Sequence, residues 1–360
     1  MQETVSPYYL LYDHLRVSTV PKEYKFETWF PDLVPTVVKY FETEIEELDK
    51  YPFNGRRPIS KKFQGLTDEI TKLIPYWSKL AGYTEGRICY HIYSVFFCLL
   101  HDPGYLSLSK YDKNVLLWTN LFHDISKRGT PEVEGKDNIH PFKSAWRTLH
   151  VMQDSLNWIN IKEEEWKVWD DIFDRAYMFR NGEIVQDHSY LKSIKAFLDK
   201  NVGDNKFLLD IIYMTLLHQS LPNMKEWKHK SIIHPLEEVK YYFDSRRMKL
   251  MKIFMRNDSV SYTLFKPMHT THSCSHQLDR YIDVLIKYLE CIEEFDAFAL
   301  EFGEAGLEET SKKYLKTANG TILRQTLIDG VIVQYVAGEI LNEKTDAIRE
   351  KPQSKFSKMS

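Results

Sequence analysis

The stretch Leu121–Lys127, which reads Leu-Phe-His-Asp-Ile-Ser-Lys, places a histidine and an aspartate side by side at the end of an apolar run. If residues 112–128 form one helix, Leu117, Leu121 and Asp124 lie on one stripe of it, and this stripe is otherwise apolar. The carboxylate would then point inward, where it costs several kcal/mol unless it is paired, protonated or bound to a cation. Because the histidine lies about 100° round the helix axis from it, the two side chains could bind one divalent metal ion. The alternative is a helix C-terminus at which the pair satisfies itself.

The composition is that of a globular protein with a sizeable core. Of its 360 residues, 43% are hydrophobic and 14% aromatic, and the formal net charge is -3. This charge gives no bulk attraction to nucleic acids or membranes, so any phosphate binding must be local. The four cysteines form no CxxC pair, no signal peptide is visible, and the most apolar stretch, residues 88–100, is too short to span a bilayer. We therefore expect a cytoplasmic protein that binds no membrane.

Helical periodicity dominates from residue 61 onward, which predicts an all-α fold. We expect an N-terminal extension at 1–60, a main helical domain at 61–300, C-terminal helices packed on it at 301–344 and a disordered tail at 345–360. The individual helices are expected at residues 36–50, 66–80 with a break near Pro75, 87–100, 112–128, 140–158, 161–180, 205–219, 235–265 and 277–302. Residues 181–205 are expected to form a loop with a short helix.

A second polar residue interrupts an apolar helix face at His91. In the helix expected at 87–100, this histidine shares a stripe with Ile88 and Val95. Arg87 precedes it by four residues on the same side, which would put a cation near whatever His91 contacts. The alternative to a metal ligand is a core histidine bonded to a carbonyl oxygen.

His140 begins a third segment with chemical potential. It stands near a helix N-terminus and is followed at one and two turns by Lys143, Ser144 and Arg147. Helix N-termini and basic side chains both favour an anion, so this edge is a candidate phosphate site. A solvated basic face is the alternative.

Two more polar groups come from later helices. His218 ends the apolar helix expected at 205–219, in the same kind of place as His123. Asp258 lies on a mostly apolar face of the helix expected at 235–265. For Asp258 the alternative is a buried salt bridge with Arg87 or Arg256. Asp244 is a rival for the last carboxylate ligand, although its basic neighbours favour a salt bridge or the helix surface.

In this order, the polar groups resemble the pattern of the HD-domain superfamily of metal-dependent phosphohydrolases. The interval from His91 to the His-Asp pair is similar to that of the family, and residues 121–127 resemble its apolar-His-Asp-x-Gly-Lys core, with Ser126 in place of glycine. Residues 140–145, His-Pro-Phe-Lys-Ser-Ala, are similar to its His-x-x-x-Ser-Ala element. The segment 251–262 looks like the helix that delivers the last aspartate in HD domains attached to CCA-adding and related nucleotidyltransferases. The resemblance covers roughly residues 85–265.

The resemblance implies an HD-like helical bundle and a specific site. By it, His91, His123, Asp124 and Asp258 would be the core metal ligands. His140 and His218 would bind a second metal ion or line the phosphate pocket. Lys127 would approach the substrate phosphate.

From this ligand set we expect a hydrolase that cleaves a phosphate ester with a water activated by one or two divalent ions, whether Mn, Fe, Ni, Zn or Mg. Asp124 and Lys127 would be catalytic, and Arg87, Lys127, Lys143 and Arg147 would bind phosphate oxygens. The substrate would be a phosphorylated small molecule or nucleotide, or a nucleic-acid end. A di-iron oxygenase of the same superfamily and a non-catalytic scaffold that makes protein interactions are the alternatives. The sequence sets neither the metal nor the oligomeric state.

Overall fold

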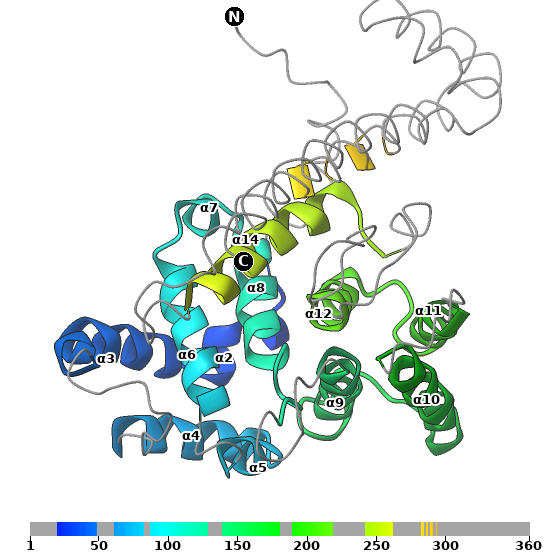
Figure 1. Ribbon diagram of the computed structural model, residues 1–360, viewed down its shortest axis with the longest axis horizontal. Coiled ribbons are helices and arrows are strands. Elements are labelled where there is room, and N and C mark those ends of the chain that lie inside the picture. Colours follow the sequence, from blue (N-terminus) through cyan, green and yellow to red (C-terminus); the bar gives the residue numbers. More distant parts are fainter. Residues whose placement is uncertain are drawn as a thin grey trace, which may run out of the picture. The chain divides into compact units, whose positions relative to one another are not determined.

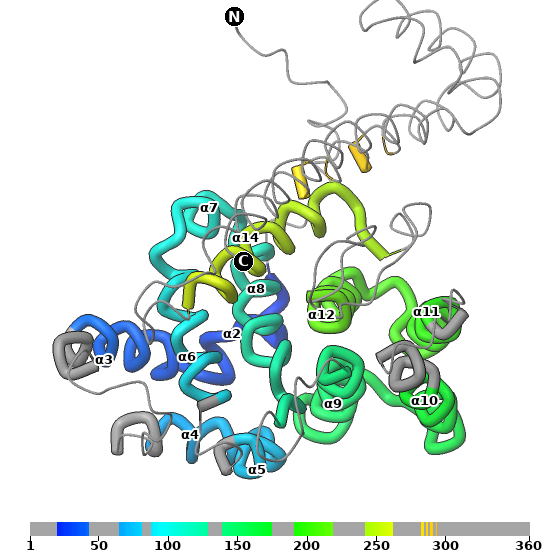
Figure 2. Tube along the Cα trace, viewed as in Figure 1, coloured from blue at the N-terminus to red at the C-terminus, as the bar shows by residue number. Residues whose placement is uncertain are grey.

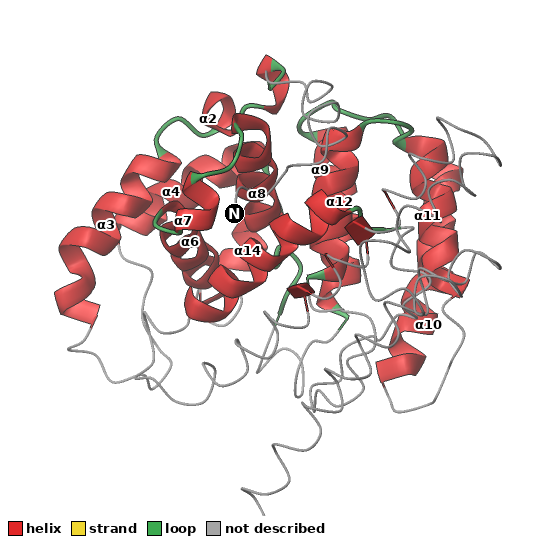
Figure 3. Cartoon of the chain, turned by 90° about the horizontal axis from the view of Figure 1, so that it is seen from above, coloured by secondary structure: helices red, strands yellow, loops and turns green. Residues whose placement is uncertain are grey.

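The computed structural model describes residues 20–48, 61–82, 87–128, 139–180, 189–218 and 242–261, together with six residues between 282 and 293. Throughout this part of the chain, every regular element is an α-helix or a 3-10 helix, as Figure 3 shows. The predicted all-α fold is therefore confirmed. The chain divides into two compact units: Val17–Tyr242 with Ile253–His269, and Met1–Arg16 with Phe243–Lys252 and Thr270–Ser360.

The first of these units carries nearly all the described helices, whose course along the chain can be followed in Figure 2. They are η1 (Lys22–Tyr24), α2 (Phe26–Trp29), α3 (Leu33–Leu48), α4 (Lys61–Leu73), α5 (Trp77–Gly82), α6 (Arg87–Leu100), α7 (Pro103–Leu106), α8 (Lys110–Phe122), α9 (His140–Asp154), η3 (Glu163–Lys167), α10 (Val168–Arg180), α11 (Ser189–Asn201) and α12 (Lys206–Leu217). The helix α14 (Ser245–Ser261) contributes its residues from Ile253 onward to this unit.

Helix α8 is the central element of this unit. It packs against α6 and α12, and α9 packs against both α8 and α12 (Figure 1). Ser109 caps its N-terminus by accepting a hydrogen bond from the backbone N–H of Asp112, 3.1 Å away. Ten of its residues, from Asp112 to Phe122, are buried, Trp118 and Phe122 completely. Because its neighbours cover it on several sides, α8 delivers the residues that follow it into the interior.

Contrary to the helix expected over 112–128, α8 ends at Phe122, and residues 123–126 form a turn. The backbone N–H of Ile125 bonds to the carbonyl of Phe122, and that of Lys127 to the carbonyl of Asp124. Hydrogen bonds to α9 hold the turn as well: the N–H of Ser126 donates to Ser144 Oγ, and its hydroxyl to the Lys143 carbonyl, each over 3.2 Å. Asp124 is nevertheless fully buried. The prediction of an inward carboxylate is therefore confirmed, although a turn holds it and not a helix.

The described part of the expected N-terminal extension belongs to the core of this unit. Phe26 is fully buried, and its backbone N–H donates to Asn114 Oδ1 over 2.7 Å. Trp118 Nε1 donates to the Tyr24 carbonyl over 2.9 Å, and the Tyr24 ring stacks on Phe207. These contacts tie residues 20–30 to α8 and to the start of α12.

Other helix predictions hold with shifted ends. The break near Pro75 separates α4 from α5, and the helices at 87–100 and 205–219 appear as α6 and α12. Residues 181–205 are less irregular than expected, because α11 fills much of this range. The expected helices at 301–344 and the tail at 345–360 lie outside the described residues. The helix expected at 235–265 was predicted to start too early: residues 242–244 are not helical, and α14 begins at Ser245, where Asp244 caps it. Among the described helices, none is both long and apolar enough to cross a membrane.

In the second unit, the described residues surround the start of α14. Asp244 Oδ1 accepts a hydrogen bond from the backbone N–H of Arg247, and Glu293 accepts from both the N–H and the hydroxyl of Ser245. Lys252 pairs with Asp283 over 2.7 Å. Asp244 thus caps a helix, which agrees with a structural role and not with its rival assignment as a ligand.

Candidate metal centre

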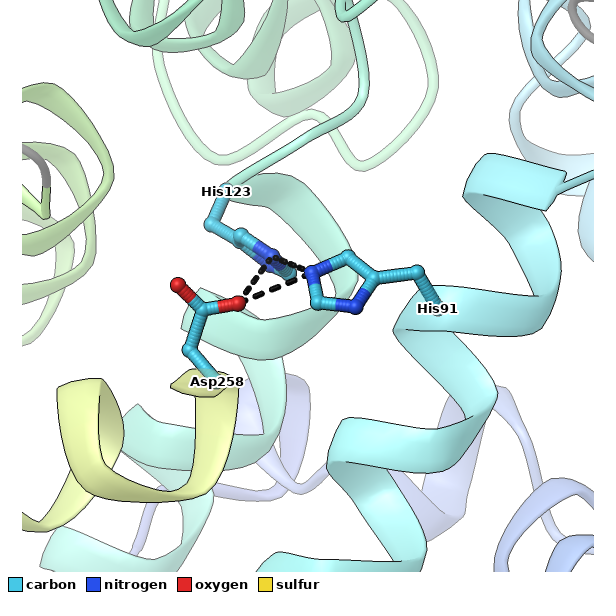
Figure 4. A group of neighbouring side chains, drawn as sticks. All are labelled: His91, His123 and Asp258. Atoms are coloured by element: carbon cyan, nitrogen blue, oxygen red, sulfur yellow. Dashed lines mark hydrogen bonds and ion pairs between the residues drawn. The ribbon is translucent and has the colours of Figure 1, made fainter. Parts of the chain in front are cut away.

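All six side chains predicted as metal ligands gather in the first unit, in two groups of three. His91, His123 and Asp258 form one, which we call the Asp258 group (Figure 4), and Asp124, His140 and His218 form the other, the His140 group. Within each group the ligand atoms lie within 4.8 Å of one another. In the part of the chain that the structure describes, these are the two sets of His, Cys, Asp and Glu side chains spaced closely enough to hold a metal ion.

The Asp258 group draws on three elements. His91 comes from α6, His123 follows α8, and Asp258 lies in the last turns of α14. Asp258 Oδ1 is 2.8 Å from His91 Nε2 and 3.8 Å from His123 Nε2, and the two Nε2 atoms are 3.4 Å apart. Two ligands that each lie about 2.1 Å from one ion are roughly 3 to 3.5 Å apart. The three separations lie within or just outside this range, so the ligand atoms are close enough together to bind one ion after small shifts.

The His140 group has similar spacing. Asp124 Oδ1 is 2.9 Å from His140 Nε2 and 3.6 Å from His218 Nε2, and these two nitrogens are 3.2 Å apart. Its three side chains are almost completely buried. They come from the turn after α8, the first residue of α9 and the residue that follows α12.

Asp124, a member of the His140 group, also faces the Asp258 group, because its two oxygens face in different directions. While Oδ1 faces His140 and His218, Oδ2 lies 3.5 Å from His91 Nε2 and 3.6 Å from His123 Nε2. A carboxylate in this position can bridge two ions. With Asp124 counted for each, the arrangement offers four protein ligands to one ion and three to the other.

Hydrogen bonds to the second ring nitrogen fix the tautomer of three of the histidines. His123 Nδ1 lies 2.8 Å from the Asn120 carbonyl, and His218 Nδ1 lies 2.7 Å from the Thr215 carbonyl. Since a carbonyl only accepts, both Nδ1 atoms must carry a hydrogen. Ser261 Oγ donates to the Asp258 carbonyl over 2.7 Å and lies 3.2 Å from His91 Nδ1, from which it can accept. In this tautomer, Nε2 of all three rings carries the lone pair that a metal ligand needs.

This tautomer leaves His91 and His123 with two lone pairs facing each other over 3.4 Å. Either a proton or a cation must separate them. Burial lowers the pKa of His123 to about 3, so adding a second proton to that ring, at Nε2, is costly near neutral pH. Burial also lowers the pKa of His140, although nearby Asp124 opposes this shift.

The carboxylates of the site are held ionised. Burial alone would raise the pKa of Asp124, but the charges of Lys127, His123 and His140 hold it well below its usual range. Burial likewise opposes ionisation of Asp258, but His91 and His123 beside it together keep its pKa below the usual range. Asp124 Oδ1 is buried, with His140 Nε2 at 2.9 Å and His218 Nε2 at 3.6 Å. An ionised carboxylate oxygen beside two imidazoles is a set of donors that suits a divalent cation.

The predicted phosphate-binding residues occupy different places. Lys127 Nζ donates to Asp124 Oδ2 over 2.7 Å, and its side chain is 23% exposed, so it lies at the edge of the site. Arg147 stacks on the Tyr76 ring, with Cζ 3.9 Å from the ring centroid. Lys143 is half-buried on the first turn of α9. Arg87 begins α6, and its side chain lies outside the described residues.

The sequence analysis missed two residues near the ligands, one that bonds His91 and one that bonds the residues just before Asp258. Ser261 lies one turn beyond Asp258 and bonds His91. Asp102 is buried and pairs with Arg256, which had been considered as a salt-bridge partner of Asp258. A signal for Asp102 existed, because Asp102-Pro103-Gly104 is a typical helix start. Its partners, however, lie more than 150 positions further along the sequence.

Comparison of the chain with protein-family models, with curated proteins and with solved structures found no match. The geometry of the two groups therefore carries the functional argument.

Proposed function

We propose that this chain is a metal-dependent phosphohydrolase of the HD type, which binds two divalent ions on either side of Asp124. The observation that carries the proposal is the division of the Asp124 carboxylate between the two groups, with one oxygen toward each pair of histidines. The order of the six ligands in the sequence, which resembles the HD pattern, supports the same assignment.

Both groups contain imidazole and carboxylate and no thiolate, which suits Mn, Fe, Ni or Zn. When bound at such a site, divalent ions lower the pKa of a water molecule and polarise a phosphoryl oxygen. The protein would hold the six ligands in place through buried helix ends and the Nδ1 hydrogen bonds of its histidines. Asp258 is the most exposed of the six, with 19% of its side chain accessible, so substrate would approach from its side.

Lys127 has a defined part in this proposal. Its ammonium group neutralises Asp124 Oδ2 in the structure, and its partial exposure leaves it within reach of an incoming anion. When cations take over the charge of Asp124, Lys127 would be released to pair with a phosphate oxygen. Lys143, half-buried on the adjacent helix, is placed to add a second positive charge. A nucleotide or a nucleic-acid end is the substrate class that we propose, on the resemblance alone.

The test combines metal content with activity. Protein purified without chelators, and protein loaded with Mn, Fe, Ni or Zn, would be assayed on nitrophenyl phosphate, on bis-nitrophenyl phosphate and on a panel of nucleotides. We expect two metal equivalents and hydrolysis that a chelator abolishes. The matched variants are Asp124→Ala and Asp154→Ala, the second an exposed aspartate near the end of α9.

Other outcomes would reject the proposal in distinct ways. Six ligands of this kind would also suit two irons, so oxygen consumption by the iron-loaded protein without phosphate release would indicate an oxygenase. A protein that binds no metal after incubation with each ion would be the scaffold considered as an alternative.

A further inference from the structure

Asp102 is a buried carboxylate outside the two ligand groups. It lies in the corner between α6 and α7, where it caps α7 by accepting hydrogen bonds from the backbone N–H groups of Gly104 and Tyr105, at 2.7 and 3.3 Å. Capping a helix of only four residues does not explain why an acid is buried here. Asp102 has a second set of hydrogen-bond partners, and these indicate a further role.

These partners come from α14, immediately before the ligand Asp258. Arg256 donates to Asp102 from two nitrogens, with Nε 3.0 Å from Oδ2 and Nη2 2.6 Å from Oδ1. Asn257 Nδ2 donates to Oδ2 over 2.8 Å. Asp102 thus accepts hydrogen bonds from four residues, two on α7 and two on α14. Paired charges with this many hydrogen bonds hold their elements in a defined position.

The packing around Gly104 shows how closely the two elements approach. A Cβ atom at this position would lie 2.9 Å from Asp102 Oδ1 and 3.3 Å from both Arg256 Nη2 and Ile253 Cγ1. A side chain at position 104 would therefore force the Asp102 carboxylate to shift and would crowd Arg256 and Ile253 of α14.

We propose that Asp102 is a positioning residue for the Asp258 group, and that it keeps α14 at the distance from α6 at which Asp258 and Ser261 reach His91. Asp258 follows Arg256 and Asn257 directly, so a shift of these residues moves the carboxylate that lies 2.8 Å from His91 Nε2. The His140 group takes no ligand from α14. Loss of the Asp102 contacts would therefore weaken one of two metal sites and spare the other. This inference rests on the proposed metal centre.

The experiment is a titration of metal-stripped protein with Mn(II), with bound equivalents counted and the magnetic coupling between the two ions followed by electron paramagnetic resonance. Wild type is compared with Asp102→Asn and with Gly104→Ala, which separates the helices without removing a charge. We expect both variants to keep one tight equivalent, to bind the other roughly 10- to 100-fold more weakly, and to lose the coupling signal at equal metal concentration. Arg256→Lys, which keeps the charge, should retain more of the second equivalent than Arg256→Gln.

Two controls separate positioning from general destabilisation. Gly65→Ala makes the same change in α4, where nothing lies within 4 Å of the added Cβ. Ser109→Ala removes the N-cap of α8 without touching the Asp102 contacts. Both should bind two equivalents as wild type does, even where the unfolding temperature falls. If Asp102→Asn does not fold, Gly104→Ala decides.

The outcomes distinguish this inference from the proposed function. Wild type that binds no ion overturns both. Wild type that binds metal, with Asp102→Asn or Gly104→Ala folded and indistinguishable from it, overturns the positioning role alone. Loss of both equivalents together, in proportion to the fall in unfolding temperature, also overturns it, because that result would follow from destabilisation.

Discussion

The two ligand groups that share Asp124 are built in different ways. The His140 group comes from the ends of α8, α9 and α12, which pack directly on one another, and its side chains are almost completely buried. The Asp258 group takes its last ligand from α14, more than 130 positions after Asp124, and that ligand is 19% exposed. One half of the site is thus a product of core packing, and the other depends on a hydrogen-bonded contact that holds a separate helix in place. The difference implies that the Asp258 half is the more easily lost and the more accessible to substrate.

The largest effect is expected where the two groups meet. Asp124→Ala removes the carboxylate that both groups face. We therefore expect both metal equivalents to be lost and the rate of phosphate-ester hydrolysis to fall by about three orders of magnitude or more. Metal analysis and initial rates on the same preparations measure this. Asp154→Ala should behave as wild type. A folded Asp124→Ala protein with two ions would remove the basis for a shared ligand.

A smaller effect is expected when only one group is broken. Asp258→Asn and His218→Gln should each lose one of the two metal equivalents. The ion that remains in Asp258→Asn lies in the His140 group and should bind more tightly than the ion that remains in His218→Gln. Mass spectrometry of the metal-loaded proteins under native conditions counts the ions. His150→Gln, a change on α9 at a histidine stacked on Trp166, is the matched control and should keep both. Identical affinities of the remaining ion in the two variants would contradict the proposed asymmetry.

A smaller effect on metal binding is expected from loss of the hydrogen bond that orients His91. Ser261→Ala removes the acceptor 3.2 Å from Nδ1, and loss of such a partner weakens metal binding by roughly 10- to 100-fold. We expect this loss in the Asp258 group only, since the corresponding acceptor for His218 is a backbone carbonyl. Competition with a chelator of known affinity measures it. An unchanged affinity would show that the tautomer of His91 is set by something else.

The smallest expected effect concerns pH. Although burial alone would raise the pKa of Asp102, hydrogen bonds from Arg256 and Asn257 hold it below its usual value. The stabilisation from this group is therefore complete above the unfolded pKa of about 3.9 and is lost as the pH falls toward the lower pKa of the folded state.

Urea unfolding of the metal-free protein tests this prediction. The difference in unfolding free energy between wild type and Asp102→Asn should be constant from pH 7 to about 5 and should shrink below about pH 4. A difference that stays constant down to pH 3 would mean that the carboxylate is not the source of the stabilisation.

Features that depend on local sequence pattern could be predicted. Apolar periodicity located α6 and α12, and His91 and His218 stood out as candidate ligands because they are polar residues in apolar helical segments. The end of α8 was placed too late, because hydrogen bonds from Ser126 to α9 help to form the turn, and no local pattern encodes them. Asp102 was missed for the same reason: its helix-start motif is local, but its role comes from Arg256 and Asn257. What the sequence could not supply was contact between distant elements, and such contacts decide the geometry of the Asp258 group.

An anomalous difference map from crystals grown with Mn(II) would show directly whether two ions share Asp124. We expect two peaks roughly 3.5 to 4 Å apart, one on each side of Asp124. One should lie among His91, His123 and Asp258, and the other beside His140 and His218. Absence of density at both groups, at Mn(II) concentrations that support activity, would contradict the proposed two-ion site.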